Sequence, residues 1–233
     1  MNDIGFLQEL TGFLDLSAVD ECDAAAIEAL CAKAQTPNGP VAAVVVPSGF
    51  VGQAKRLLAG TGIKTAAQIS FPNGGEDTVA LETETEIAVS DGAEEIEFVM
   101  AYKIFADGRP GFAETQIVRM KRKCGDAMLK VVLEVGEFPD TKVISDASTV
   151  ALAAGADMLG TSNGQSMHVP TQDQSRAILS TIAEADVGKG FKIGERTEAA
   201  ADILKQFKLA REICANTSAN KQFFRANGNA VLD

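Results

Sequence analysis

Short apolar runs alternate with longer amphipathic segments along most of the chain, and this alternation predicts the order of strands and helices. The run AAVVV at 42–46 is rich in β-branched residues, which is typical of a buried parallel strand. Apolar positions spaced three and four residues apart predict helices between such runs. The expected strands are one around Asp15, then 42–46, 64–70, 94–100, 128–134, a very short one within 153–165, 189–193 and 223–232. The expected helices are 3–14, 22–34, 52–58, 76–91, 111–124, 140–154, 171–184 and one from 198 to 208 or beyond.

About eight strand candidates therefore alternate with helices through short connections, which is the pattern of a right-handed βα series. This pattern favours an α/β fold, a closed (β/α)8 TIM barrel, over an open doubly wound sheet, with 3–14 as an extra N-terminal helix. The length of 233 residues suits one such domain spanning 1–233. No G-x-G-x-x-G or P-loop spacing supports a nucleotide-binding fold.

Charged side chains lie on the faces of several predicted strands. In EEIEFVM the period of two places Glu95 and Glu97 on one face, and in MLKVVLE it places Lys130 and Glu134 on one face. In KGFKI, Lys192 projects opposite to its apolar neighbours. A barrel brings such side chains together on its axis, and buried charges persist only when they are paired. We therefore expect a charged cluster inside the barrel.

The composition narrows the range of partners. A net charge of -11 disfavours nucleic acid and anionic membranes, although a local basic pocket can still bind a small anion. The amino terminus lacks the basic start and continuous apolar core of a secretion signal, and no run approaches the roughly 20 apolar residues of a membrane span. We expect a cytoplasmic protein that acts on a small molecule.

Metal and cofactor chemistry has little support in the sequence. The four cysteines show no C-x-x-C spacing, and the single histidine, His168, stands alone in a polar loop. We expect no metal and no cofactor, and we interpret the cysteines as ordinary buried or surface thiols.

The stretch AAGADMLGTSNGQ at 153–165 has the pattern of a strand that opens onto an active site. A helix ends in small residues, a short apolar strand follows, and a polar loop emerges where parallel strands present side chains to ligands. Met158, Gly160 and Ser162 share one face of this strand. The central inward position is therefore a glycine, which has no side chain.

Five motifs, in the same order along the chain, resemble those of the deoxyribose-phosphate aldolases. AAGADMLGTSNG is similar to AGADFIKTSTG, EEIEFVMAY to DEVDVV, LKVVLEVGE to LKVIIETGE, FPNG to FPHG, and GFKIGERT to GFKPAGGVRT. The resemblance implies a TIM barrel that needs no metal and cleaves 2-deoxyribose 5-phosphate reversibly to glyceraldehyde 3-phosphate and acetaldehyde. In that family a lysine amine forms a Schiff base with the substrate carbonyl, and a second lysine keeps the first one unprotonated.

The resemblance assigns catalytic positions residue by residue. The Schiff-base lysine of the family falls on Gly160, which cannot form an imine. The second lysine corresponds to Lys192, the lysine of the LKV motif to Lys130, and the proton-handling aspartate to Glu97, whose side chain is one methylene longer.

The expected substrate-binding positions also differ from the family pattern. The resemblance implies that the substrate is held by Glu134, Ser162, Gly164, Gly194 and Asp15. Glu195 places a negative charge in a shortened phosphate loop, Gln165 replaces a lysine, and the GASS motif maps onto 227–230, which lacks its hydroxyls.

Two hypotheses follow, and ordinary aldolase activity is predicted absent or very weak in both. In one, the protein is a lyase with an altered substrate, and Lys192 supplies the amine. In the other, it is a non-catalytic relative that binds a metabolite, such as a phosphorylated sugar or an aldehyde, or a partner subunit such as a second copy in a homodimer. A purely structural role is open for Lys192, paired with Glu97 or Glu134, and Glu95 is interpreted as a supporting or rim residue.

Overall fold

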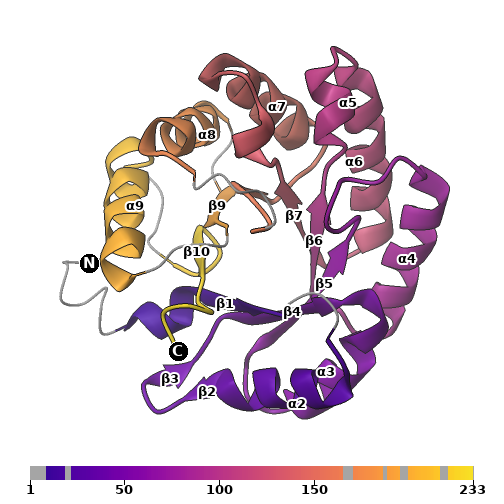
Figure 1. The fold of residues 1–233 in the computed structure, drawn as a ribbon, viewed down its shortest axis with the longest axis vertical. Helices are drawn as coiled ribbons and strands as arrows, with labels where there is room; N and C mark the ends of the chain where they lie inside the picture. The colour runs from indigo at the N-terminus through magenta and orange to yellow at the C-terminus, as the bar shows by residue number, and fades with distance from the viewer. Residues whose placement is uncertain are drawn as a thin grey trace.

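The chain folds into a closed barrel of eight parallel strands surrounded by helices, as seen in a computed structural model (Figure 1). The structure describes residues 9–18, 22–164, 170–185, 188–194, 199–215 and 220–232. The barrel strands are β1 (Leu14–Ser17), β4 (Ala43–Pro47), β5 (Lys64–Ile69), β6 (Glu95–Val99), β7 (Met128–Val132), β8 (Met158–Gly160), β9 (Gly190–Ile193) and β10 (Phe224–Asn227). Around the barrel they follow the order β1-β10-β9-β8-β7-β6-β5-β4, and β4 closes the barrel by pairing with β1. The predicted (β/α)8 fold is confirmed.

The helices cover the outside of the barrel, as Figure 1 shows for α2 to α9. Their bounds are α2 (Ala24–Lys33), α3 (Val51–Leu57), α4 (Thr78–Ser90), α5 (Tyr102–Ala106), α6 (Pro110–Cys124), α7 (Thr141–Ala153), α8 (Gln172–Glu184) and α9 (Ala200–Ile213). Several begin at a residue whose side chain accepts a hydrogen bond from a free backbone N–H of the first turn. These capping residues are Asp23, Asp77, Asp140 and Thr171.

Three local features differ from the sequence-based expectation. Residues 3–8 of the expected N-terminal helix lie outside the described part of the chain, and Leu10–Phe13 form a 3-10 helix, η1, that leads directly into β1. A small hairpin of β2 (Gln35–Thr36) and β3 (Gly39–Pro40), which was not predicted, follows α2. The short helix α5, which follows β6, was not predicted.

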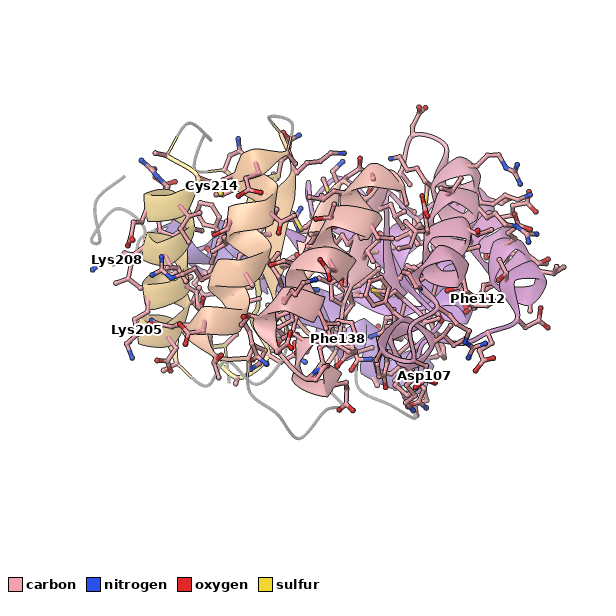
Figure 2. The ribbon with its side chains drawn as sticks, turned by 90° about the horizontal axis from the view of Figure 1, so that it is seen from above. Asp107, Phe112, Phe138, Lys205, Lys208 and Cys214 are labelled. Carbon is pink, nitrogen blue, oxygen red and sulfur yellow. The ribbon has the colours of Figure 1, made fainter. Side chains whose placement is uncertain are left out.

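The two ends of the barrel have different roles, and Figure 2 shows them from the side. Asp107 and Phe138, which lie in segments that follow β6 and β7, are at the lower edge, whereas Cys214, at the end of α9, is at the upper edge. The lower edge is therefore where the strands end and where βα loops gather, which is the end of such barrels that binds ligands. We call this end the mouth.

The apolar core lies between the barrel and its helices. Four phenylalanine rings of this core pack together where η1, β9, β10 and α9 meet. The Phe224 ring centroid lies 5.2 Å from that of Phe207, 6.2 Å from that of Phe191 and 6.4 Å from that of Phe13. Phe224 is fully buried, so these contacts hold the last strand against its helix.

Phe224→Ala is expected to lower the free energy of unfolding by about 3–5 kcal/mol, because it leaves a cavity among three rings. Val118→Ala, at a position that is 49% exposed on α6, is the control and is expected to change it by less than about 0.5 kcal/mol. Urea unfolding followed by circular dichroism measures both. Equal losses in the two variants would contradict the assignment of Phe224 to the core.

Candidate active site

Six charged side chains meet inside the barrel, and we call them the ion network: Asp15, Glu95, Glu97, Lys130, Lys192 and Arg225. They come from β1, β6, β7, β9 and β10, so five strands contribute to one cluster. Strand register explains the convergence, because Glu97 pairs with Lys130 across β6 and β7, and Arg225 pairs with Lys192 across β9 and β10. Neighbouring positions in register point to the same face of a sheet.

Lys130 and Lys192 each lie between carboxylates. Lys130 Nζ is 2.7 Å from Asp15 Oδ2 and 2.6 Å from Glu95 Oε2. Lys192 Nζ forms an ion pair with Glu97 Oε2 and lies 3.3 Å from Asp15 Oδ2. The expected pairing of Lys192 with Glu97 is thus present, and Glu95 is part of the network instead of the rim.

Arg225 completes the network, and the sequence reasoning missed it. Its guanidinium forms ion pairs with Asp15 Oδ1 and, at 2.8 Å, with Glu95 Oε1. The available signal was a charged residue in the middle of the apolar run FFRA, which is the same signal that identified Lys192. The uncertain bounds of the last strand hid it.

The electrostatics of the network favour charged forms. Burial alone raises the pKa of Asp15, but the charges of Arg225, Lys130 and Lys192 outweigh it and hold the pKa well below its ordinary value. Burial likewise opposes ionisation of Glu95, yet Lys130 and Arg225 lower its pKa. Burial alone lowers the pKa of the Arg225 guanidinium. The charges of Asp15 and Glu95 outweigh burial and hold this pKa above its ordinary value. Three carboxylates and three cations therefore balance one another in the buried interior of the barrel.

Gly160 lies beside Lys192 on the neighbouring strand. The two residues are register partners across β8 and β9, so a side chain at position 160 would project beside that of Lys192 into the barrel. A Cβ atom built on Gly160 would lie 3.3 Å from Val132 Cγ2, a close contact that a small shift of the valine side chain relieves. The position is therefore open to a side chain.

Glu134 is not on the strand face that the period of two assigned to it. Strand β7 ends at Val132, and Glu134 has a φ of 56°, in the left-handed region, at the start of the 3-10 helix η3 (Val135–Glu137). Its carboxylate accepts a hydrogen bond from the backbone N–H of Asn163, at 2.5 Å. The expected face shared with Lys130 was wrong because the strand stops two residues earlier, and Glu134 ties the loops after β7 and β8 together.

Ser162, Gly164 and Gly194 lie at the mouth, where β8 and β9 end. A Cβ on Gly194 would lie 2.0 Å from the Ser162 carbonyl oxygen, so only glycine fits this close approach of two backbones. The Gly194 N–H donates to Thr161 Oγ1 at 2.8 Å, and Gly164 has a φ of 86°. The other residues that the family comparison singled out here, Gln165 and Glu195, lie outside the described residues, as does His168.

The segment 227–230 joins the last strand to the first. The Asn229 side chain forms two hydrogen bonds with the Ser17 backbone, accepting from N at 3.0 Å and donating to O at 2.8 Å. The Asn227 amide donates to Ser17 Oγ at 3.1 Å. These two asparagines therefore extend the pairing of β10 with β1 beyond the ends of the strands.

A cavity of about 540 Å³, which we call the mouth cavity, lies where β4 and β5 end. It is lined by Cys22, Pro47, Ser48, Phe50, Gln68, Ser70, Phe71, Pro72, Asn73, Gly75, Leu81 and Glu84. Gln68 is the register partner of Glu97, so one wall of the cavity adjoins the ion network. Sequence reasoning did not foresee this cavity.

The cysteines and the acidic residues offer no metal centre within the described parts of the chain. No group of three or more His, Cys, Asp or Glu side chains there is arranged to hold a metal ion. Burial raises the pKa of Cys31 to about 11 and that of Cys124 to about 12, so neither thiol ionises near neutral pH. Among the described helices, none is long and apolar enough to cross a membrane.

A closed parallel barrel with lysines and carboxylates converging on its axis defines a (β/α)8 protein whose candidate site lies inside the barrel, at the carboxyl ends of the strands. The model of the DeoC/LacD family aldolases matches residues 11–193. A deoxyribose-phosphate aldolase of Agrobacterium fabrum (strain C58 / ATCC 33970) is 33% identical over 223 residues, covering 94% of this chain and 86% of that protein. The chain belongs to the DeoC/LacD family of aldolases.

Solved structures share the fold. The deoxyribose phosphate aldolase of Aeropyrum pernix superposes with a TM-score of 0.80 at 20% identity, covering 98% of this chain and 91% of that one. A protein of Toxoplasma gondii ME49, provisionally described as a deoxyribose-phosphate aldolase, gives a TM-score of 0.85 at 23% identity, covering 96% of this chain and 90% of that one. At these identities the likeness supports the fold alone.

Asp15→Asn is expected to lower the free energy of unfolding by about 3–5 kcal/mol at pH 7, because it leaves buried cations without their shared partner. Asp146→Asn, which removes an exposed ion pair with Lys142, is the control and is expected to cost less than about 0.5 kcal/mol. Urea unfolding followed by circular dichroism at pH 7 measures both variants.

The same variant changes how stability depends on pH. The pKa of Asp15 in the folded chain lies below its ordinary value of 3.8, so the folded state binds fewer protons than the unfolded state in acid. Its contribution is complete above about pH 5 and is lost as the pH falls through 4 toward the lowered pKa. Between pH 7 and 3.5 we expect wild type to lose more stability than Asp15→Asn. An equal loss in both would contradict the lowered pKa.

Proposed function

We propose that this aldolase-family barrel does not carry out the ordinary cleavage of 2-deoxyribose 5-phosphate, and that it binds a small metabolite at its mouth. The observation that carries the proposal is the glycine at position 160. The motif AGADMLGTSNG matches the family motif AGADFIKTSTG with glycine in place of the Schiff-base lysine, and the structure gives this glycine an inward-facing position beside Lys192. An imine needs an amine at that point, and glycine has none.

The surroundings of Lys192 support the same conclusion. A nucleophilic lysine must be unprotonated, and family chemistry achieves this by placing a second ammonium beside it. Here Lys192 instead contacts the carboxylates of Glu97 and Asp15, which stabilise an ammonium. Its geometry therefore suits a structural ion pair better than an attack on a carbonyl.

A second candidate function has one observation in its favour. Lys192 is the register neighbour of Gly160, and Glu97, a group that can accept a proton, touches its Nζ. A lyase with a different substrate that uses Lys192 as its amine would need no other nucleophile. Trapping experiments distinguish this candidate from the first.

Wild-type protein is expected to form no covalent adduct on a lysine inside the barrel when it is incubated with acetaldehyde or 2-deoxyribose 5-phosphate and reduced with borohydride. Mass spectrometry of tryptic peptides measures modification at each lysine. Cleavage is expected to be at least about 10⁴-fold slower than by the Agrobacterium fabrum enzyme, since loss of a covalent nucleophile costs on the order of 10⁶-fold in a serine protease. A reduced adduct on Lys192 would contradict the proposal and support the altered lyase.

Gly160→Lys is expected to form the adduct that wild type lacks. A fourth cation would upset the balance of three carboxylates and three cations, so burial should keep the new amine neutral and nucleophilic. Gly160→Met, which has a side chain of similar length without an amine, is the matched control and is expected to form none. The same mass spectrometric assay measures both variants.

An unmodified Gly160→Lys variant, or equal modification of both variants at other lysines, would show that position 160 is not where the amine is missing. If the lysine variant is trapped yet still does not cleave the sugar phosphate, Glu97 or the altered phosphate loop also blocks the reaction.

A cytoplasmic location and a homodimer belong to the same proposal. Analytical ultracentrifugation measures whether the protein is a homodimer.

A further inference from the structure

The mouth cavity lies at the ends of β4 and β5, whereas the segments that the family resemblance assigns to the phosphate follow β9 and β10. Among the described residues that line it, Glu84 alone is charged, and no lysine or arginine contributes to the lining. Its lining residue Gln68 is the register partner of Glu97 in the ion network, and each cation of that network lies against carboxylates. A dianionic phosphate in this cavity would meet a carboxylate and find no basic side chain among the described residues.

Glu84 differs from its neighbours on α4. Glu82 is paired with Arg119 and Arg122, and Glu86 is paired with Lys123. Glu84 instead faces the cavity and accepts a hydrogen bond from Ser48 Oγ at 2.7 Å. Within the described parts of the chain, no cationic side chain lies within ion-pair distance of it. One carboxylate oxygen is thus held in place by a serine, and its charge has no counter-ion there.

Two aromatic side chains line the same cavity as this carboxylate. Phe50, at the end of the 3-10 helix η2 (Ser48–Phe50), and Phe71, after β5, both line the cavity and are only partly buried. The faces of aromatic rings attract organic cations, and the attraction adds to that of a nearby carboxylate. Gln68 and Asn73 also line the cavity and add amide groups that can bind a hydroxyl.

We propose that the mouth cavity binds a small organic cation, with its positive charge against Glu84 and its alkyl groups against Phe50 and Phe71. A volume of about 540 Å³ accommodates a molecule of metabolite size. This proposal specifies the class of ligand for the metabolite-binding role proposed above, and it rests on that role. No phosphate-binding step is part of it.

Choline and 3,3-dimethylbutan-1-ol are the matched probes, because they have the same shape and differ only in whether the central atom of the trimethyl group is charged. Isothermal titration calorimetry on the full chain is expected to show saturable choline binding, with the neutral alcohol at least about tenfold weaker. Inorganic phosphate is expected neither to bind in the cavity nor to displace choline.

Glu84→Gln is expected to weaken choline binding by about tenfold or more while leaving the binding of the neutral alcohol unchanged. Glu86→Gln, two residues further on the same helix, keeps Glu84 intact and is expected to leave both affinities within about twofold. Phe50→Leu keeps an apolar wall but removes a ring, so it should weaken choline severalfold more than the alcohol. Circular dichroism establishes that each variant is folded.

Equal affinities for choline and the alcohol, no effect of Glu84→Gln, or tighter binding of phosphate than of choline would each overturn the assignment. The two proposals also fail separately. If choline does not bind while wild type remains untrapped by borohydride, the ligand class is wrong and the absence of aldolase chemistry stands. If Lys192 is trapped while choline binds through Glu84, the cation site stands and the absence of lyase activity is wrong.

Discussion

The shared position of Asp15 among three cations is the interaction on which the barrel interior depends. The Asp15 carboxylate pairs with Lys130 and Arg225, Lys192 lies 3.3 Å from it, and all four side chains are buried. Such charges are costly to bury, and they are stable together only because each has a partner of opposite sign. Glu95 and Glu97 supply the remaining two negative charges. The interior is thus a closed set in which the loss of any one member leaves another uncompensated.

This balance bears directly on the chemistry. A Schiff-base aldolase needs a neutral amine inside the barrel, and an excess of positive charge is the physical means of keeping it neutral. With glycine at position 160, the described residues of the interior carry no excess positive charge, and both lysines are engaged by carboxylates. The charged interior is therefore stable as an ion network without needing to act as a catalyst. The cation site that we propose lies at the mouth, where Glu84 is outside this balance.

The sequence predicts the fold well because strand and helix periodicity is strong where strands are buried on both faces. The run AAVVV and the alternation in EEIEFVM mark β4 and β6 to within about one residue. The convergence of Glu97, Lys130 and Lys192 also follows from a period of two applied to barrel strands. Periodicity fails at strand ends, and Glu134 illustrates why, since its left-handed backbone breaks the alternation. Arg225 was missed because few apolar residues define its strand.

The cavity could not be predicted because it is built by loops from three βα connections and by α4, whose relative positions no local pattern encodes. The sequence also does not show which acidic side chains form ion pairs. Glu82, Glu84 and Glu86 look alike in sequence, although only Glu82 and Glu86 have cationic partners among the described residues. Tertiary register decides which of them faces α6 and which faces the mouth.

The central claim is that Lys192 is a charged member of a balanced network instead of an amine held ready for attack. Nuclear magnetic resonance of side-chain Nζ atoms in protein labelled with ¹⁵N-lysine tests it most directly, with Lys192→Arg identifying the resonance. The account predicts an ammonium signal for Lys192 that persists at neutral and mildly alkaline pH. A neutral amine signal at pH 7 would contradict it.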